Sequence, residues 1–354
     1  MNVVRLSRPA ALTARLARHG LTHPVDTEAG YVELFRRLQP VSPEANSYPG
    51  SAPRLMHRTT SGVVDSVVAD DLRSRRQLVK GRFHGGTVGY VHVDDLPLYA
   101  AAYRQPLERF DARQEAALRA LTYAGPLSPR QLRHETGLAH RPLMAAVHRL
   151  ERAFIICEDQ TDSAWDRPLH LVDREFPELW AQAPPVAVAQ AEVLARLLAA
   201  QVFATTAELA TGSGLGKRRV ASTLAGMEED RRIEAVAPED GGEQGWRLAE
   251  DDPGAADDPT GLVRVLHRRD PLVRPRLDEL LQRFTGREVL QYLLIDNDIH
   301  GAACGHWRIK AHDVEDVLIS ESYVTGWQTA AIKAVRQRYP EPDQHVLACN
   351  GEPL

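Results

Sequence analysis

Two stretches of the sequence carry the same order of expected elements, and this repetition limits the possible folds more than any other feature. Residues 111–153 contain three runs with apolar spacing near 3.6, which predict three helices, with Asp111 and Ser128 placed as N-caps of the first two. Residues 154–172 then alternate as a β-hairpin does. Helix, short helix, turn, helix and hairpin is the order of a winged helix-turn-helix unit.

A second copy of this pattern follows about 75 residues later. Residues 188–201 and 216–233 predict two longer helices, separated by a short helix and a glycine-rich turn, and residues 234–250 predict a hairpin with a Gly-Gly tip. A period of this length indicates repetition of one supersecondary unit. The region before residue 100, with helices, a long loop and a hairpin at 78–93, is expected to be a third, degenerate copy.

From about residue 260 the pattern changes. Residues 263–286 predict helix, residues 287–323 predict strands joined by tight turns, and residues 326–339 predict a final helix. The expected fold class is therefore α+β and helix-rich, with tandem winged helix-turn-helix units and a β-rich C-terminal domain. The expected boundaries are 1–105 for the degenerate unit, 106–183 and 184–255 for the two clear units, and 256–354 for the C-terminal domain.

The net charge of −5 does not exclude a nucleic-acid partner, because many acids are concentrated in one place. About eight of the 48 acidic residues lie at 239–258, which reads as a linker, and the rest of the chain is close to neutral with local basic runs. No window has the ~18 consecutive apolar residues of a membrane span, and the charged residues within 1–21 do not fit a signal peptide. Three distant cysteines without a CxxC pair indicate a reducing, cytoplasmic location.

Two familiar ligand patterns are incomplete in this sequence. The phosphate-loop pattern GxxxxGK[ST] fails, because Thr211 and Arg218 stand where it needs a glycine and a hydroxyl residue. Histidines near the C-terminus, together with one cysteine, fit no compact set of metal ligands, and these residues are His300, Cys304, His306 and His312. We therefore expect no metal and no other cofactor.

Basic residues on the third helix of each clear unit are the first candidates for contacts with double-stranded DNA, because this helix usually lies in the groove. Arg and Lys suit the role, since phosphate contacts supply much of the affinity. The candidates there are Arg141, Arg149, Lys217, Arg218 and Arg219. A dense basic run nearer the N-terminus adds Arg75, Arg76, Lys80, Arg82 and His84. The alternative is that these units contact other proteins and that the arginines form a solvated face.

Three segments carry a resemblance to a known family through their order and spacing. They are ELFRRLQPVSP at 33–43 followed by PRLMHRT, RRQLVKGRFHGGTVGYVHVDDLP at 75–97, and VRVLHRRDPLVRPRLDELLQRFTG at 263–286. Together they resemble the AlkZ/YcaQ family of winged-helix alkyl-DNA glycosylases. This resemblance implies a C-shaped DNA-binding architecture and hydrolysis of the N-glycosidic bond of alkylated purines, without metal or organic cofactor. Some relatives confer self-resistance to DNA-alkylating natural products.

The resemblance also assigns site residues, and the sequence departs from the family pattern at three of them. Gln39 matches the first glutamine of the family's Gln-x-Gln or Gln-x-Asp catalytic motif, whereas Val41 occupies the second motif position. Gly85 and Gly89 stand where many relatives carry an Arg and a His. These departures motivate the alternative that the protein binds DNA without catalysis, as a relative that has lost its active site.

The chemistry of base release explains why position 41 matters. Cleavage of an N-glycoside passes through an oxocarbenium-like state, so the enzyme must hold a water at the sugar and oppose positive charge. Side-chain oxygens can do both, and valine has no hydrogen-bonding atom. Glu44 is the expected substitute, with Ser42 and Asn46 as alternatives. The expected catalytic residues are therefore Gln39 and Glu44.

Three functions remain open from the sequence. The first is a monofunctional DNA glycosylase that acts on alkylated or bulky-adducted purines, in DNA repair or in self-resistance. The second is a DNA-binding protein without catalysis, such as a transcription regulator or a lesion binder. The third uses the winged helices for protein contact. The expected partner is double-stranded DNA, without a membrane, and the expected oligomeric state is a monomer.

Overall fold

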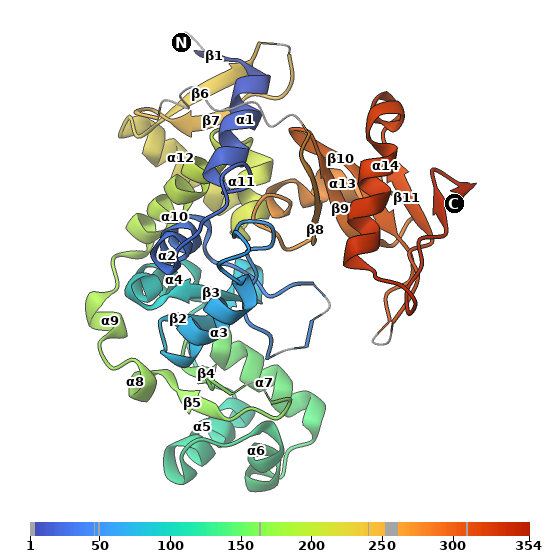
Figure 1. The fold of residues 1–354 in the computed structure, drawn as a ribbon. Helices are drawn as coiled ribbons and strands as arrows, with labels where there is room; N and C mark the ends of the chain where they lie inside the picture. Colours follow the sequence, from blue (N-terminus) through green and yellow to red (C-terminus); the bar gives the residue numbers. More distant parts are fainter. Residues whose placement is uncertain are drawn as a thin grey trace.

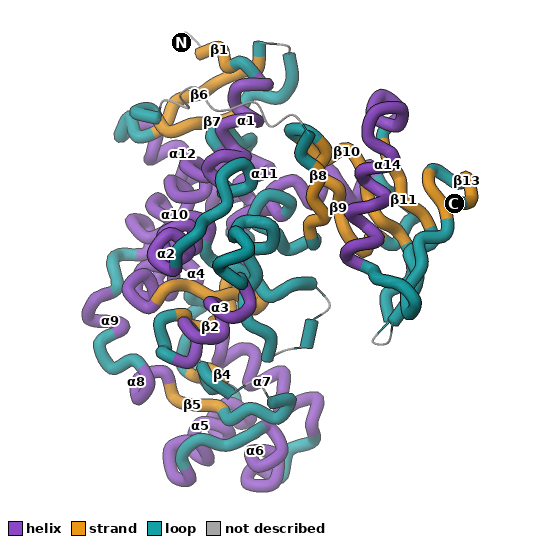
Figure 2. Tube along the Cα trace, in the orientation of Figure 1, coloured by secondary structure: helices purple, strands orange, loops and turns teal. Residues whose placement is uncertain are grey.

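The chain forms a tall helical column and a separate β-rich domain beside it (Figure 1). The structure is a computed structural model, and it describes residues 4–45, 47–48, 50–162, 164–239, 241–251, 261–308 and 311–354. The column is built from residues 4–251, and the domain on its side from residues 261–354. Figure 2 shows that helices dominate the column, whereas strands are concentrated in the C-terminal domain. The expected helix-rich α+β class with a β-rich C-terminal domain is thus confirmed.

The N-terminal region contains a hairpin surrounded by helices. Its elements are β1 (Val4–Leu6), α1 (Arg8–Arg18), α2 (Glu28–Leu38), α3 (Asp65–Ser74), β2 (Leu78–Phe83), β3 (Thr87–His92) and α4 (Leu96–Tyr103). Strands β2 and β3 pair antiparallel, with Leu78 opposite His92. A long loop, residues 39–64, separates α2 from α3. Helices, loop and hairpin occur in the order that the sequence predicts.

Both clear repeats have the predicted order of three helices and a hairpin. The first contains α5 (Ala112–Ala124), α6 (Pro129–Thr136), α7 (His140–Arg152), β4 (Ile156–Glu158) and β5 (Leu169–Leu171). The second contains α10 (Val186–Gln201), α11 (Thr206–Ser213), α12 (Lys217–Glu229), β6 (Ile233–Pro238) and β7 (Gly245–Leu248). Two short helices, α8 (Val172–Glu175) and α9 (Leu179–Gln182), join them. Asp111 and Ser128 form capping boxes, as their positions in the sequence predict.

One pairing crosses the expected unit boundaries. Strand β1 lies parallel to β6, with Val4 opposite Val236. Helix α1 also attaches to the second repeat, because Arg15 donates hydrogen bonds to the backbone oxygens of Gln201 and Phe203 at 2.9 and 2.8 Å. The first residues of the chain therefore complete the sheet of the second repeat. Local sequence patterns do not report such a pairing, since the partners lie more than 200 residues apart.

The C-terminal domain is an open six-stranded sheet in the order β13-β12-β11-β10-β9-β8. Its elements are β8 (Val263–Leu266), η3 (Arg274–Arg276), α13 (Leu277–Arg283), β9 (Val289–Ile295), β10 (Asp298–Cys304), β11 (Asp316–Ile319), α14 (Glu321–Arg338), β12 (Ala348–Cys349) and β13 (Glu352–Pro353). The prediction of helix from residue 263 is wrong for β8, whose β-branched residues pair with β9. The expected boundary at residue 255 lies outside the described residues.

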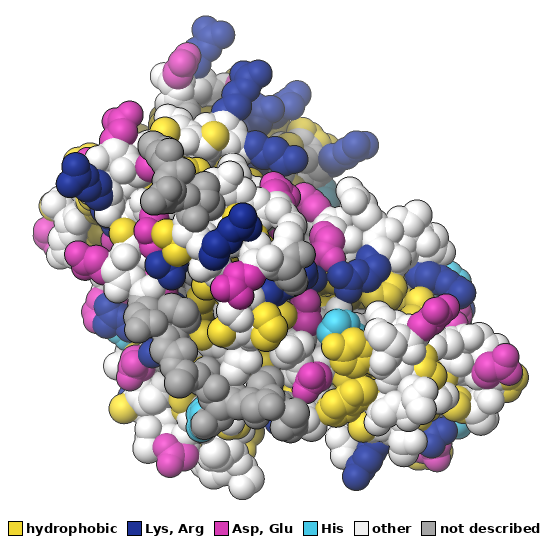
Figure 3. Space-filling model, turned by 90° about the horizontal axis from the view of Figure 1, so that it is seen from above, with side chains coloured by type: hydrophobic (Ala, Val, Ile, Leu, Met, Phe, Trp, Pro, Cys, Tyr) yellow, Lys and Arg dark blue, Asp and Glu magenta, His cyan; other side chains and the backbone are white. Residues whose placement is uncertain are grey.

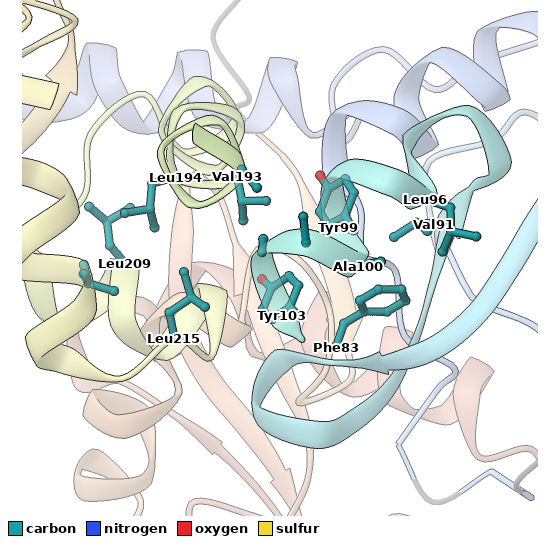
Figure 4. Packing of buried hydrophobic residues seen from close by; sticks show 14 of the residues in the cluster. Phe83, Val91, Leu96, Tyr99, Ala100, Tyr103, Val193, Leu194, Leu209 and Leu215 are labelled. Carbon is teal, nitrogen blue, oxygen red and sulfur yellow. The ribbon is translucent and has the colours of Figure 1, made fainter. Parts of the chain in front are cut away.

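A cluster of buried aromatic and aliphatic side chains fixes the hairpin of the N-terminal region against the second repeat (Figure 4). Phe83 of the hairpin packs edge-on against Tyr99 and Tyr103 of α4, with ring centroids 6.2 and 5.8 Å apart. Leu194 and Leu209 continue the cluster into α10 and α11. A buried aromatic side chain removes ~150–250 Å² from water, worth roughly 4–6 kcal/mol before the entropy cost of ordering it.

A fully buried ion pair joins the N-terminal region to the C-terminal domain. The Arg58 guanidinium meets the Asp270 carboxylate through two contacts of 2.7 and 2.8 Å, and both side chains are 0% exposed. Arg58 also donates to the backbone oxygens of His19 and Met56 at 2.8 and 2.9 Å. Asp270 accepts the N–H of Leu272 at 2.9 Å. Both charges are thus paired and hydrogen-bonded, which is the condition for burying them at moderate cost.

Burial by itself raises the pKa of Asp270, but the Arg58 guanidinium outweighs it and holds this pKa at about 2. The folded pKa lies below the unfolded value of ~3.9. The interaction therefore contributes stability above about pH 4, and this contribution is lost as the pH falls toward 2.

Replacing Asp270 is expected to destabilise the fold strongly, because it leaves a buried guanidinium without its counter-charge. We predict that Asp270→Asn lowers the free energy of unfolding by about 3–5 kcal/mol. The apolar double variant Arg58→Met/Asp270→Leu should fall closer to the wild type, since neither charge remains buried. Urea-induced unfolding followed by circular dichroism measures both.

The matched control is Glu33→Gln, which removes an exposed ion pair with Arg37. Its effect should stay within about 0.5 kcal/mol. Equal decreases in the free energy of unfolding for Glu33→Gln and Asp270→Asn would show that the buried pair stabilises the fold no more than an exposed pair does.

Candidate functional site

Gln39 directly follows the last residue of α2, and its side chain is buried and hydrogen-bonded at both ends. Its amide nitrogen donates a hydrogen bond to Asp95 Oδ2 at 2.7 Å, and its amide oxygen accepts one from the backbone N–H of His92 at 2.8 Å. The hydroxyl of Tyr99 donates to the backbone oxygen of Gln39 at 3.1 Å. The residue is 6% exposed. Both ends of the amide therefore position the chain where the 39–64 loop begins.

Asp95 is the acceptor at the centre of this polar cluster. It accepts from Arg36 at 2.8 Å and from Arg196 at 3.1 Å, in addition to Gln39. Burial raises the pKa of Asp95, but the hydrogen bonds from Arg36 and Gln39 outweigh it and leave this pKa below its ordinary value. Asp95 is thus held ionised between two arginines, and it ties α2 and the start of α4 to α10.

Two of the departures from the family pattern lie side by side. Val41 is fully buried, and its backbone pairs with Tyr90 of β3 through hydrogen bonds of 2.9 and 2.8 Å. Gly89 faces this segment, since a Cβ there would stand 3.3 Å from Pro40 Cβ. The third departure, Gly85, lies at the hairpin tip against Gly214. No side-chain oxygen or nitrogen is contributed at positions 41, 85 or 89.

Glu44 lies further along the same loop and faces the C-terminal domain. Its carboxylate forms an ion pair with Arg338 at the end of α14. Ser42 is buried, and its hydroxyl donates to the backbone oxygen of Val88 at 3.3 Å, so it ties the loop to strand β3. Asn46 lies outside the described residues. Glu44 lines a cavity between the loop and the C-terminal domain, and Ser42 is not among the residues that line this cavity.

The cavity beside Glu44 has a volume of about 200 Å³ and lies between the loop and the C-terminal domain. Gln291 of β9, Trp307, Arg338 and Tyr339 form much of its wall. Its lining contains carboxylate, amide, guanidinium and aromatic groups. This mixture suits a polar planar ligand better than an apolar one.

Most of the basic run near the N-terminus is used inside the fold. Lys80 is buried against Glu158 of β4, and Arg82 contacts Glu151 of α7 at 3.0 Å. His84 is buried at the hairpin tip. These placements speak against the predicted DNA contacts of Lys80, Arg82 and His84. The acids that pair with Lys80 and Arg82 lie 78 and 69 residues away in sequence, where no local pattern links them to the basic run.

Arg75 and Arg76 remain near the surface but already have acidic partners. Arg75 contacts Glu28 at 2.6 Å, and Arg76 contacts Glu175 at 2.7 Å. Because these charges are balanced locally, a phosphate would have to displace a carboxylate before it gained anything from them. Both residues are therefore weaker candidates for DNA contacts than the sequence indicates.

The basic residues on the third helices are exposed, as expected for contact residues. Lys217, Arg218 and Arg219 begin α12 and form no ion pair with any described residue. Arg141 and Arg149 are exposed on α7, and Arg149 lies 3.7 Å from Asp111. On the face seen in Figure 3, Lys and Arg side chains are interspersed with Asp and Glu, so no single basic patch covers it.

Sequence reasoning missed a set of arginines near the junction of the loop with the C-terminal domain. Two of them, Arg268 and Arg269, immediately precede the buried Asp270, and Arg269 is partly buried. Burial and the neighbouring Arg268 lower the pKa of Arg269. The full set is Arg54, Arg264, Arg268 and Arg269, and none of these forms an ion pair with a described residue. These arginines are visible in the sequence, in PRLMHRT and VRVLHRRDP. They lie within a few residues of Arg58 and Asp270, which form the buried ion pair.

The described residues offer no group of three or more His, Cys, Asp or Glu side chains placed to share a metal ion. Within the same residues, no helix combines the length and apolar character that crossing a bilayer requires.

Comparison with known proteins identifies the family. A family model described as DNA glycosylase AlkZ-like matches residues 54–340. The chain belongs to the AlkZ-like DNA glycosylase family. Membership in a family of AlkZ-like DNA glycosylases makes DNA the expected macromolecular partner. The resemblance that the three sequence segments carry is confirmed. Gln39 and Glu44 lie outside the matched residues, so any role for them depends on the geometry described above.

A solved structure shows the same fold. The structure of the Streptomyces sahachiroi DNA glycosylase AlkZ matches with a TM-score of 0.71 at 15% sequence identity, covering 98% of this chain and 100% of that one. A protein from Corynebacterium diphtheriae, DIP2311, matches 53% of this chain and 37% of its own at 18% identity, but its TM-score of 0.17 carries no weight. Comparison with curated protein sequences gives no significant match.

We predict that Lys217, Arg218 and Arg219 contribute to DNA binding through phosphate contacts. Replacing all three with Gln should weaken binding to every duplex sequence and lower the slope of log K against log salt concentration by about 2–3, because each released counterion contributes about 0.9. Fluorescence anisotropy with a labelled duplex over a salt series measures this slope. The control Arg75→Gln/Arg76→Gln should change the slope by less than about 1, since those charges are balanced by Glu28 and Glu175. An unchanged slope in the triple variant would contradict the assignment.

Proposed function

We propose that this protein hydrolyses the N-glycosidic bond of alkylated or bulky-adducted purines in double-stranded DNA, as a monofunctional glycosylase. The observation that carries the proposal is the placement of Glu44. It is a carboxylate on the loop that follows the family's motif position, held by Arg338 at the edge of a cavity. Family membership supplies the reaction class. Two biological roles fit this chemistry, general DNA repair and self-resistance to a DNA-alkylating natural product.

Glu44 is assigned the role that position 41 no longer fills. In the reaction, the oxygen of a water adds to C1′ of the sugar, and the carboxylate takes the proton that the water loses. The electrons of the breaking C–N bond pass to the purine, where they cancel the positive charge of an N-alkylated ring. The same carboxylate opposes the charge that develops on the sugar. The ion pair with Arg338 holds the Glu44 carboxylate in place for both tasks.

A purine that is already cationic lowers the catalytic contribution that the protein must make to base release. An N7- or N3-alkylpurine leaves as a neutral base, so the leaving group needs no added proton from an acid. One positioned carboxylate then provides the main catalytic contribution, worth on the order of 10²–10³ in rate for a preorganised polar group. Damaged bases of this kind are the substrate class that a site with Glu44 alone suits best.

Gln39 is assigned a positioning role rather than contact with the reacting atoms. Its amide is occupied by Asp95 and His92, and it fixes the point where the loop leaves α2. Glu44 lies five residues further along this loop. A change at Gln39 therefore acts on the reaction through the placement of Glu44.

We also propose which basic residues hold the duplex. Lys217, Arg218 and Arg219 are exposed and unpaired among the described residues, and Arg141 and Arg149 occupy the matching helix of the first repeat. Arg268 and Arg269 immediately precede Asp270, which joins the end of the 39–64 loop to the C-terminal domain through Arg58. DNA contacts along the two repeats, and where the 39–64 loop meets the C-terminal domain, would bring the damaged base to this loop.

Removing the Glu44 charge should abolish most of the activity while leaving DNA binding intact. We predict that Glu44→Gln slows release of N7-methylguanine from a duplex by about 10²-fold or more. Cleavage of the resulting abasic sites by hot alkali measures the rate, and anisotropy measures the affinity. Glu33→Gln, an exposed and distant carboxylate variant, should release base at the wild-type rate.

Thermal unfolding separates catalysis from folding in this test, because Glu44 also pairs with Arg338. Glu44→Asp keeps the charge and should retain part of the activity. Release at the wild-type rate by Glu44→Gln, with an unchanged unfolding temperature, would remove Glu44 from the mechanism.

A second candidate function is DNA binding without catalysis. The observation that favours it is the apolar environment at positions 41 and 89, where Val41 is fully buried beside Gly89. For this function, the wild type and Glu44→Gln would show the same lack of base release while both still bind DNA. A footprint at one defined duplex sequence would then identify a regulator.

A further inference from the structure

The connection between β4 and β5 in the first repeat carries a tryptophan that the fold leaves uncovered. Trp165 is 76% exposed, and the ring of Tyr48 on the 39–64 loop lies beside it, with ring centroids 6.3 Å apart at an angle of 44°. Tyr48 is 47% exposed. A tryptophan is highly buried on average, since burial takes ~150–250 Å² of its surface out of water. An exposed aromatic pair of this kind is typical of a surface that a partner covers.

The backbone that carries Trp165 is held on both sides of the ring. The N–H of Ala164 donates to Asp162 Oδ1 at 2.7 Å, and the Asp166 carboxylate accepts from the hydroxyl of Ser128 at 2.7 Å. An aromatic side chain on a fixed backbone loses little conformational entropy when a partner packs against it. Trp165 is therefore preorganised for contact with a partner.

The surroundings of Trp165 on the first repeat carry unbalanced positive charge. An open hollow of about 700 Å³ lies between α6 and the β4–β5 connection, with Arg130 and Arg133 on its α6 side. Both arginines are exposed, and neither forms an ion pair within the described ranges of the chain. Asp162 and Asp166 line the other side, but their carboxylates accept hydrogen bonds from the fold. Aromatic rings near unpaired arginines are typical of surfaces that bind nucleic-acid bases together with their phosphates.

A buried arginine fastens the β4–β5 connection to the 39–64 loop. The Arg73 guanidinium donates to the backbone oxygen of Gly50 on the loop at 2.5 Å, and to that of Thr161 on the connection at 3.5 Å. Arg73 is 8% exposed. Together with the contact between Tyr48 and Trp165, this gives two links between the loop and the first repeat. The aromatic pair therefore keeps its place relative to the loop that carries the proposed catalytic carboxylate.

The aromatic pair and the proposed reaction site use nearby points of one loop but different neighbours. Glu44 and Tyr48 are four residues apart, so their Cα atoms lie within ~14 Å of each other. Glu44 contacts Arg338 of the C-terminal domain, whereas Tyr48 contacts Trp165 of the first repeat. Figure 1 shows the first repeat at the bottom of the column and the C-terminal domain beside the column. A base pair that opens at this loop can therefore be divided, with the lesion toward Glu44 and its former partner toward Trp165.

We propose that Trp165, supported by Tyr48, stacks on the base of the complementary strand that extrusion of the lesion leaves unpaired. The proposal rests on the proposed function, because taking the damaged base out of the duplex creates that unpaired base. Every base has a face that can stack on an aromatic ring, so the contact needs no particular sequence. This stacking holds the duplex open while the lesion occupies the site beside Glu44. Trp165 is thus a positioning residue for the reaction.

Binding of abasic duplexes tests the proposal without any base release. One duplex carries a tetrahydrofuran abasic site opposite adenine, and the other carries tetrahydrofuran at both positions of the pair. Fluorescence anisotropy should show that the wild type binds the first about tenfold more tightly, which lies within the range for one base stacked on an aromatic side chain. Trp165→Ala should remove this difference, and Trp165→Phe should retain part of it.

Tyr123→Ala is the matched control, because Tyr123 is an aromatic residue of the same repeat that is 87% exposed. It should keep the tenfold difference, and so should Glu44→Gln, since the abasic site is already formed. The unfolding temperature of Trp165→Ala should equal that of the wild type, because the fold covers little of this side chain. Equal affinity of the wild type for the two duplexes, or a difference that survives in Trp165→Ala, overturns the proposal. A Trp165-dependent difference in a protein that releases no N7-methylguanine overturns the proposed function and leaves the stacking site in place.

The fluorescence of 2-aminopurine identifies which base is stacked, because stacking on an indole ring quenches it. With the probe opposite tetrahydrofuran, the wild type should quench this fluorescence and Trp165→Ala should quench it much less. With the probe next to tetrahydrofuran in the same strand, the two proteins should give the same signal. Quenching that depends on Trp165 only at this neighbouring base would overturn the assignment to the complementary strand.

Discussion

The buried pair of Arg58 and Asp270 is the interaction on which the relative placement of the column and the C-terminal domain depends. It joins the end of the long N-terminal loop to the segment that follows β8. Arg58 also holds the backbone of His19 after α1, so three parts of the chain meet at one guanidinium. Apolar contacts alone would allow these parts to slide, whereas a bidentate pair fixes distance and orientation together. The burial of both charges makes the arrangement intolerant of small shifts.

The same pair determines where the proposed site lies. The 39–64 loop is fixed near its start by Gln39 on Asp95 and near its end by Arg58 on Asp270. Between these points, Glu44 contacts Arg338 and so reaches the C-terminal domain. The loop therefore spans from the column to the C-terminal domain, and the cavity lies between the loop and that domain. A carboxylate on a loop held at three points is preorganised, which is the main requirement for electrostatic catalysis.

Local features of the fold could be predicted from the sequence, because their causes are local. Asp111 and Ser128 were placed as N-caps from spacing alone, and both form capping boxes. The order of elements in both repeats follows from apolar periodicity and glycine positions. By contrast, the pairing of β1 with β6 joins residues more than 200 positions apart. Residues 263–266 were expected to be helical, and pairing with β9 makes them a strand.

The site shows the same division between local and distant causes. The glutamine at the end of α2 and the missing second residue at Val41 are visible in the sequence. The burial of Lys80 is not, because Glu158 approaches it from a hairpin in the next repeat. The Asp95 acceptor that occupies Gln39 lies 56 residues away. Glu44 was proposed for its charge alone, and only the fold brings it to Arg338 and Gln291 at one cavity.

The central claim is that Glu44, on a loop fixed between the column and the C-terminal domain, faces the sugar of the damaged nucleotide. A crystal structure of the protein with duplex DNA that carries N7-methylguanine on a hydrolysis-resistant 2′-fluoro sugar measures this most directly. The account predicts that C1′ of the lesion lies within reach of one water molecule held by the Glu44 carboxylate. A lesion bound against the first or second repeat, with Glu44 far from the DNA, would contradict it.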